Sequence, residues 1–275
     1  MADDPLLNNL AAQLGRVRGI VGVMLGGSRA RGEHTETSDY DLGLYYRHPL
    51  DTNALGTLAR GVAGPDAQVT EPGEWGPWVD GGAWLSIEGR SVDWIYRDVD
   101  RVRRAWGDAQ QGSFGFNAQV GHPFGVPDFA YPAELALGVV LDDTTGELTE
   151  LKCETRTYPP ALSTALSRRL WEADFLLSGV RKSMARADPV WVAGCLFRIV
   201  LLCVHALHGY AGRWLINEKG ALDSTERLSV TPPGFVDRAR DICGRTGSML
   251  SDVAHTLESA AELINTTRVT IHSPR

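Results

Sequence analysis

The segment Gly26-Gly27-Ser28-Arg29-Ala30-Arg31-Gly32-Glu33-His34-Thr35-Glu36-Thr37-Ser38-Asp39-Tyr40-Asp41-Leu42-Gly43-Leu44-Tyr45 decides the fold of the chain. It follows the apolar run Ile20 to Leu25, which has the length and composition of a buried strand. Two glycines and a serine allow a tight turn whose backbone N–H groups point outward, and such turns bind anions. The segment therefore predicts a strand that ends in a phosphate-binding turn.

A second strand is predicted where polar and apolar residues alternate from Ser38 to Tyr45. Successive side chains on a strand point to opposite faces, so Asp39 and Asp41 share one face. Two such carboxylates repel each other, and a divalent cation removes the conflict. Mg²⁺ binds one or two carboxylates together with water and nucleotide phosphate oxygens, so we expect a magnesium site here. The alternative, a solvent-facing pair on an edge strand, is disfavoured because strands rarely contain Asp.

The order of these features resembles that in the DNA polymerase β-like nucleotidyltransferase superfamily, and most closely its antibiotic-modifying and minimal members. The shared pattern is Gly-Ser, a short arginine-bearing segment and Asp-x-Asp inside an apolar strand. The superfamily signature includes a third carboxylate on a neighbouring strand, for which Asp93 is the candidate. Residues 83–87 and 91–96 are separated by three residues and predict a hairpin that lays Asp93 beside the metal strand. The resemblance covers roughly the N-terminal third of the chain.

The resemblance implies a nucleoside triphosphate, with ATP the first choice, bound together with Mg²⁺. Its lysine or other cation, which a helical domain points at the β and γ phosphates, is matched by Lys219. The implied catalytic and metal-binding residues are Asp39, Asp41 and Asp93, and the implied nucleotide-binding residues are Gly27, Ser28, Arg29, Arg31 and Lys219. Asp93 would bind a second Mg²⁺ or accept the proton of the attacking hydroxyl. Glu134 and His122 are further candidates for that base, although a structural role is favoured for each.

Several of these residues also have an ordinary structural interpretation. Ser28 is a potential helix cap. Arg29 and Arg31 are potential surface charges, Lys219 a potential exposed helix lysine, and Asp93 a potential solvated residue after a hairpin.

The resemblance also implies a small hydroxylated acceptor such as an aminoglycoside or lincosamide, hence an adenylyltransferase of the antibiotic-resistance type. One alternative is a nucleotidyltransferase that modifies a protein or an RNA end, as antitoxin-type relatives do. The formal net charge of −7 disfavours nucleic acid, because proteins that hold its backbone usually have a basic face. Another alternative is a nucleotide-binding regulator without catalysis, which three intact carboxylates argue against.

The 275 residues are enough for two domains, and we expect the boundary near residue 155. The fold class expected for residues 1–155 is α/β (α+β): a catalytic domain with a mixed sheet. Residues 156–275 carry helical periodicity and predict an all-α bundle. Its predicted helices are Pro160 to Ala187, Pro189 to Tyr210, Ile216 to Leu228, Pro233 to Cys243 and Met249 to Thr267.

The N-terminal half contains three further predicted helices: Leu6 to Val17, Asp51 to Arg60 and Asp98 to Gln110. Gly112 to Pro132 predicts a loop, because glycine, proline and phenylalanine follow one another closely. Periodicity does not distinguish helix from strand for Glu134 to Leu141 or for Gly146 to Leu151.

A cytoplasmic protein without a membrane span is expected. The four cysteines are scattered without metal-binding or disulfide spacing. The N-terminus lacks the basic start and apolar block of a signal peptide. The longest apolar region, Val190 to Leu207, is interrupted by Arg198 and His205.

Overall fold

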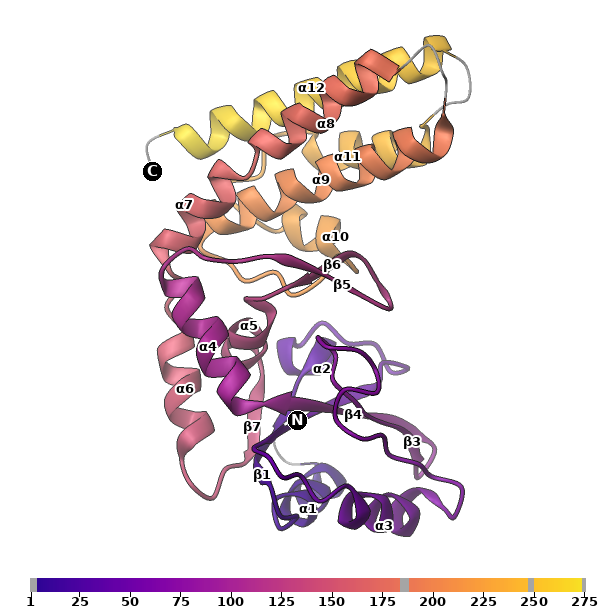
Figure 1. The fold of residues 1–275 in the computed structure, drawn as a ribbon, viewed down its shortest axis with the longest axis vertical. Helices are drawn as coiled ribbons and strands as arrows, with labels where there is room; N and C mark the ends of the chain where they lie inside the picture. The colour runs from indigo at the N-terminus through magenta and orange to yellow at the C-terminus, as the bar shows by residue number, and fades with distance from the viewer. Residues whose placement is uncertain (1–3, 184–187, 247–249, 274–275) are drawn as a thin grey trace. The chain divides into compact units, whose positions relative to one another are not determined.

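The computed structural model describes residues 4–183, 188–246 and 250–273, which form two compact units (Figure 1). The first unit comprises residues 1–108 and 114–157, and the second comprises residues 109–113 and 158–275.

The first unit is built on a five-stranded sheet with the strand order β3-β4-β2-β1-β7. Only the central pair β2 and β4 is parallel, and the other neighbours are antiparallel. The strands are β1 (Ile20–Leu25), β2 (Tyr40–Tyr46), β3 (Gly82–Ile87), β4 (Arg90–Asp98) and β7 (Val139–Asp142). The helices are α1 (Pro5–Leu14), α2 (Gly27–Arg31), α3 (Thr52–Ala63), α4 (Val99–Gln110), α5 (Ala130–Leu137) and α6 (Glu147–Thr155). The predicted α/β class with a mixed sheet is confirmed.

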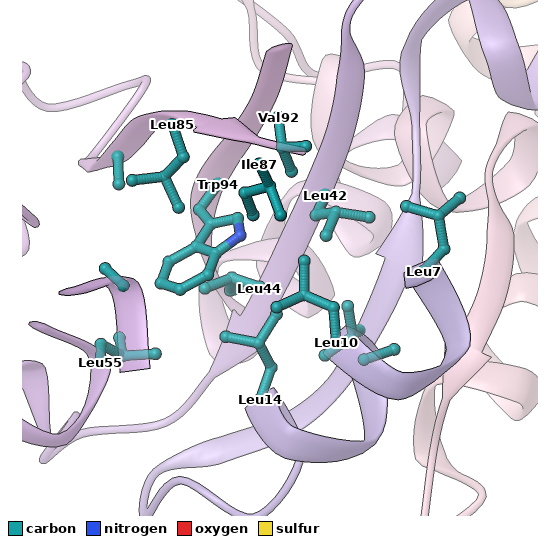
Figure 2. Packing of buried hydrophobic residues seen from close by; sticks show 14 of the residues in the cluster. Leu7, Leu10, Leu14, Leu42, Leu44, Leu55, Leu85, Ile87, Val92 and Trp94 are labelled. Carbon is teal, nitrogen blue, oxygen red and sulfur yellow. The ribbon is translucent and has the colours of Figure 1, made fainter. Parts of the chain in front are cut away.

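One face of the sheet is covered by α1 and α3 (Figure 1). Leu7, Leu10 and Leu14 recur at helical spacing, so they form one apolar stripe on α1. Figure 2 shows this stripe against Leu42 of β2 and Trp94 of β4, which are fully buried. Each such leucine stabilises the fold by about 1.5–3 kcal/mol. The predicted packing of the first helix on the sheet is confirmed.

The opposite face of the sheet is covered by α4, α5 and α6 at one end only. Met24 of β1 and Tyr45 of β2 are buried there against Val102, Tyr131 and Leu148 of the three helices. Strand alternation turns Asp41 and Asp93 to this same face, at the start of β2 and β4, where both are half-buried. The packing therefore leaves the carboxylates at the less covered end of this face.

The predicted loop at Gly112 to Pro132 is wrong, because it contains a hairpin of β5 (Phe116–Gln119) and β6 (His122–Pro127). Phe116 and Phe124 pack across the hairpin with ring centroids 4.4 Å apart. Aromatic pairs across neighbouring strands stabilise such ribbons. The two ambiguous segments are also resolved: the end of α5 and β7 occupy the first, and α6 occupies the second.

The second unit is helical, as predicted, and α9 is its central helix. Its helices are α7 (Pro160–Arg168), α8 (Trp171–Ser183), α9 (Pro189–Ala211), α10 (Ala221–Glu226), α11 (Phe235–Gly244) and α12 (Leu250–His272). Among the described residues α9 alone has the length and hydropathy of a membrane span, and 67% of its apolar window is buried within the protein. The predicted single helix at Pro160 to Ala187 is wrong, because α7 and α8 are separate; its residues 184–187 lie outside the described residues, as does Met249.

Candidate active site

Asp41 and Asp93 are direct neighbours in the sheet, because the parallel register of β2 and β4 pairs them. Adjacent strands lie about 4.8 Å apart, so the two side chains leave one face side by side. Asp93 therefore lies beside β2, as predicted from the sequence. The hairpin between β3 and β4 turns at Glu88 and Gly89, both with positive φ, and sets this register.

Asp39 lies one residue before the start of β2, close enough to act on Asp93 electrostatically. The pKa of Asp93 is raised from 3.8 to about 6. Burial is the largest cause, and the negative charges of Asp41 and then Asp39 also contribute. Like charges that repel in this way are typical of a site built for a cation.

The donor set at this position fits Mg²⁺, which prefers carboxylate oxygens. Across residues 4–183, 188–246 and 250–273, no three Asp, Glu, His or Cys side chains are already arranged to hold a metal ion. The sheet register therefore fixes the pair Asp41 and Asp93, while Asp39 stands on the segment before β2 and completes the charge around them.

The glycine turn lies directly against Asp41. The Gly26 N–H donates a hydrogen bond of 2.7 Å to the backbone carbonyl of Asp41. Gly27 has a φ of +62°, and a Cβ atom there would lie 1.7 Å from Oδ2 of Asp41. Only glycine can occupy this position, because any side chain would collide with the carboxylate. The predicted turn and the predicted metal strand are therefore in contact.

Ser28 is the second residue of α2, and the N-cap of that helix is Gly26. The interpretation of Ser28 as a helix cap therefore does not hold. Ser28 directly follows Gly27, the residue that approaches the Asp41 carboxylate.

Arg29 is buried and supports the segment that carries Asp39. Its Nε donates to the carbonyls of Ser38 (2.9 Å) and Asp39 (3.2 Å), and its Nη2 donates to those of Ser38 (2.6 Å) and Glu36 (3.4 Å). Its guanidinium also lies 3.8 Å from the ring centroid of Tyr40. The interpretation of Arg29 as a surface charge is wrong, and these bonds give it a positioning role instead of a free reach to a phosphate.

The other two predicted phosphate cations are exposed. Arg31 forms a 2.8 Å ion pair with Glu33, an arrangement that contributes little in water. Lys219 belongs to the second unit and lies in the turn before α10, not on a helix. Its backbone N–H donates to Oδ1 of Asn217 at 3.0 Å.

Glu134 and His122, the two other candidate bases, do not lie on β2 or β4 beside Asp41. Glu134 of α5 accepts two bonds from the guanidinium of Arg97, at 2.5 and 2.8 Å. Arg97 is only 8% exposed, so Glu134 is the partner that neutralises a buried charge. His122 begins β6, in the two-stranded sheet.

Trp84 and Trp75 lie next to the carboxylates but were not among the residues predicted from the sequence. The antiparallel register of β3 and β4 pairs Trp84 with Asp93, and Trp84 is 71% exposed. Its indole stacks on that of Trp75, with ring centroids 4.2 Å apart and an angle of 15°. A signal was present, because the alternation of the predicted strand turns Trp84 to the same side as Ser86, away from the core.

Part of the chain matches a known family. Residues 7–75 match the model of a family described as "Nucleotidyltransferase domain". The match includes the turn at Gly27 and the pair Asp39 and Asp41, and it ends before Asp93. It supports a nucleotidyltransferase domain in this part of the chain.

A search of the curated proteins found no match. The chain is similar to the crystal structure of a nucleotidyltransferase-like protein from Exiguobacterium sibiricum 255-15, at 12% sequence identity and a TM-score of 0.46. That similarity covers 96% of this chain and 74% of the other.

Proposed function

We propose that this chain is a Mg²⁺-dependent nucleotidyltransferase that moves a nucleoside monophosphate from a nucleoside triphosphate to a hydroxyl of a small molecule. ATP is the proposed donor, which makes the enzyme an adenylyltransferase. The proposed acceptor is an aminoglycoside or a lincosamide, and the proposed consequence is antibiotic resistance. The observation that carries the proposal is the in-register pair Asp41 and Asp93 lying against the Gly27 turn.

Each part of this site has a role in the proposed reaction. Asp39, Asp41 and Asp93 are the metal ligands, and the backbone of Gly27 and Ser28 receives the β and γ phosphates. When bound, Mg²⁺ supplies positive charge to the phosphate oxygens and to the leaving group. Positioning and charge neutralisation account for most of the rate enhancement in such reactions.

The chemical step forms one bond and breaks one. The acceptor oxygen bonds to the α-phosphorus, the bond from that phosphorus to the oxygen bridging it to the β-phosphate breaks, and pyrophosphate leaves with that oxygen. The hydroxyl proton passes to Asp93 or through a water molecule. Glu134 is not the proposed base, because it is bound to Arg97.

The proposed location is the cytoplasm, where both ATP and Mg²⁺ are present. All four cysteines are unpaired: Cys153 and Cys243 are exposed, and Cys195 and Cys203 are buried. Unpaired thiols are usual in a reducing compartment.

The experiment that tests the proposal is a donor and acceptor screen. The protein is incubated with Mg²⁺, each of the four nucleoside triphosphates and a panel of aminoglycosides and lincosamides. Mass spectrometry then looks for an acceptor that has gained a nucleoside monophosphate, and a coupled assay measures pyrophosphate. An adduct on RNA or on the protein itself would instead favour the macromolecular alternative, and nucleotide binding without turnover would favour a regulator.

The Asp41→Asn variant tests the site itself. It should fold and should lose at least about 10³-fold of the turnover, because one ligand of the proposed metal is removed. Asp66→Asn is the matched control, since Asp66 lies on an exposed turn and receives the same chemical change. Near-normal turnover by folded Asp41→Asn would overturn the assignment.

A further inference from the structure

We propose that the stacked indoles of Trp84 and Trp75, here called the indole surface, hold the acceptor, and that the acceptor presents an aminated and hydroxylated ring. This inference rests on the function proposed above and extends it to the side of the site opposite the glycine turn.

The indole surface is continuous with the carboxylate site. Asp41, Asp93 and Trp84 are consecutive partners across three neighbouring strands, so their side chains leave the same face of the sheet in one row. Ala83 and Leu85, on either side of Trp84, are buried in the core on the other face. Opposed Cβ atoms lie about 5 Å apart in an antiparallel pair, which places the base of Trp84 next to the Asp93 carboxylate.

Exposing the apolar surface of a large aromatic side chain such as Trp84 to water is unfavourable. Trp84 is 71% exposed although its partner Trp75 stacks on it. Together the two rings present a flat apolar area, and exposed apolar areas of this kind mark binding sites more often than ordinary surface.

The indole surface is held in shape by Gln119 of β5. The side-chain oxygen of Gln119 accepts the N–H groups of Trp78 (3.0 Å) and Val79 (3.3 Å), and its Nε2 donates to the Trp75 carbonyl (2.5 Å). Gly76, with a φ of +97°, lets the Gln119 amide approach the backbone. These bonds order the turn before any ligand binds, which lowers the entropy lost on association.

The glycine turn, Asp41, Asp93 and Trp84 follow one another across neighbouring strands. This order places the triphosphate at the glycine turn and the acceptor at Trp84, on opposite sides of the carboxylates. The glycine turn follows β1, next to Asp41, and Trp84 lies beyond Asp93 on β3. In phosphoryl transfer the attacking and leaving oxygens are roughly in line on opposite sides of the phosphorus. If pyrophosphate leaves towards Gly27 and Ser28, the attacking hydroxyl comes from the side of Asp93, and the ring that carries it lies over Trp84.

The charge around the indole surface favours a cationic ring. Glu74 precedes Trp75 directly, and its exposed carboxylate accepts the backbone N–H of Glu71 at 2.9 Å. The Glu71 carboxylate instead accepts the hydroxyl of Thr52 on α3 at 2.5 Å. Ammonium groups are attracted to the faces of indoles and to carboxylates. Arg101 binds the Pro77 carbonyl, and Arg90 pairs with Asp4 at 2.7 Å.

The test is a binding titration followed by tryptophan fluorescence, without nucleotide. The probes are kanamycin, an aminated trisaccharide, and maltotriose, a trisaccharide without amines. We expect a saturable fluorescence change with kanamycin and a weaker affinity for maltotriose. Trp84→Ala should weaken kanamycin binding by about tenfold, and Trp84→Phe by less because it keeps an aromatic face.

The matched control is Trp171→Ala, because Trp171 is a similarly exposed tryptophan (60%) on α8 of the second unit. It should leave the affinity for kanamycin unchanged. The inference is overturned if the natural chain shows no saturable change, or if Trp84→Ala, folded by circular dichroism, binds kanamycin within twofold of the natural chain.

A kinetic readout separates failure of this inference from failure of the proposed function. With an acceptor from the screen, Trp84→Ala should raise the KM for the acceptor and leave the KM for ATP within twofold. If the natural chain transfers nucleotide but Trp84→Ala keeps the acceptor KM, the indole surface is wrong and the function stands. If kanamycin binds through Trp84 and no acceptor is ever modified, the function is wrong while the binding surface remains.

Discussion

At the scale of single residues, the candidate site depends on two close contacts. Gly27 lies against the carboxylate of Asp41, and Asp41 lies beside Asp93. Gly27 touches Asp41 because it has no side chain, and Asp41 lies beside Asp93 because the strands are in register. Both approaches are unfavourable for an ordinary protein surface, which is why they point to a ligand.

The first prediction concerns Gly27. Gly27→Ala should abolish nucleotide transfer and lower the free energy of unfolding by about 2–4 kcal/mol, through the collision with Asp41 and the positive φ. Gly32→Ala is the matched control: its φ is +71°, but a Cβ atom there meets nothing within 4 Å. It should cost only about 1 kcal/mol. Chemical denaturation and pyrophosphate release measure the two effects, and equal losses in both variants would contradict the predicted collision.

The second prediction concerns the charge on Asp93. Its pKa is raised from 3.8 to about 6 by burial and then by Asp41 and Asp39, so the folded state holds the proton more tightly than the unfolded state. Stability without metal should therefore fall as pH rises from about 4 to 6. At pH 8, Asp93→Asn should be more stable than the natural chain by about 1 kcal/mol, because water screens part of the repulsion at a half-buried group. At pH 4 the two proteins should be nearly equal.

Magnesium should reverse this order. Mg²⁺ stabilises the protein that binds it, so millimolar Mg²⁺ should raise the Tm of the natural chain at pH 8 and leave Asp93→Asn nearly unchanged. The Tm of both proteins is measured at pH 4 and pH 8, each with Mg²⁺ and with a chelator. A natural chain whose Tm does not respond to Mg²⁺ would argue against the proposed metal site.

At the scale of elements, the segment between α2 and β2 is held in place by an arginine whose guanidinium binds backbone carbonyls. Arg29→Met should lower the free energy of unfolding by about 2–3 kcal/mol, because three carbonyls lose a charged donor. It should also weaken Mg²⁺-dependent stabilisation, since the Asp39 segment loses its support. Arg31→Ala is the control, and its exposed ion pair should be worth under about 0.5 kcal/mol. Denaturation with and without Mg²⁺ measures both, and equal effects would refute the positioning role.

The ion pair between β4 and α5 gives a prediction that also tests the choice of base. Glu134→Gln should destabilise the protein by about 2–4 kcal/mol, because it leaves the buried guanidinium of Arg97 without its counter-charge. Turnover per folded molecule should fall much less than in Asp93→Asn. Loss of turnover without loss of stability would identify Glu134 as the base instead.

Features formed by residues close together in the sequence could be predicted, and those formed by residues far apart could not. The glycine turn and the Asp39/Asp41 strand are local features, and the two-residue turn at Glu88 and Gly89 pairs neighbouring strands. The position of Asp93 could therefore be predicted. The binding of Arg29 to carbonyls up to ten residues away, and of Arg97 to Glu134, depends on tertiary packing that periodicity does not carry. The same applies to the β5–β6 hairpin, whose glycines and prolines resemble those of a loop.

At the scale of the whole molecule, the two units should respond differently to acid. His205 and His208 are buried in α9, and burial lowers the pKa of His205 to about 3 and that of His208 to about 4. Both are neutral when folded, so the unfolded state gains protons below pH 6.5 while the folded state does not. The stability of the second unit should therefore fall by about 2–5 kcal/mol between pH 7 and 4.5.

Hydrogen exchange on α9 across this pH range measures the loss. His208→Leu should make the response shallower, because one buried titrating group is removed. His255→Gln should leave it unchanged, since His255 is exposed on α12. A pH response of α9 that is the same in all three proteins would show that these histidines are not its cause.

The turn at Glu88 and Gly89 has a consequence for how such a protein can diversify. Asp93 and Trp84 lie on the two arms of one hairpin, so the proposed chemistry and the proposed acceptor contact would be inherited together. Because side chains alternate with a period of two, deleting one amino acid within either arm would exchange its interior and its working surface. Lineages that change what is modified should therefore substitute position 84 and vary the flanking 64–81 connection, while the arms between them keep a constant length.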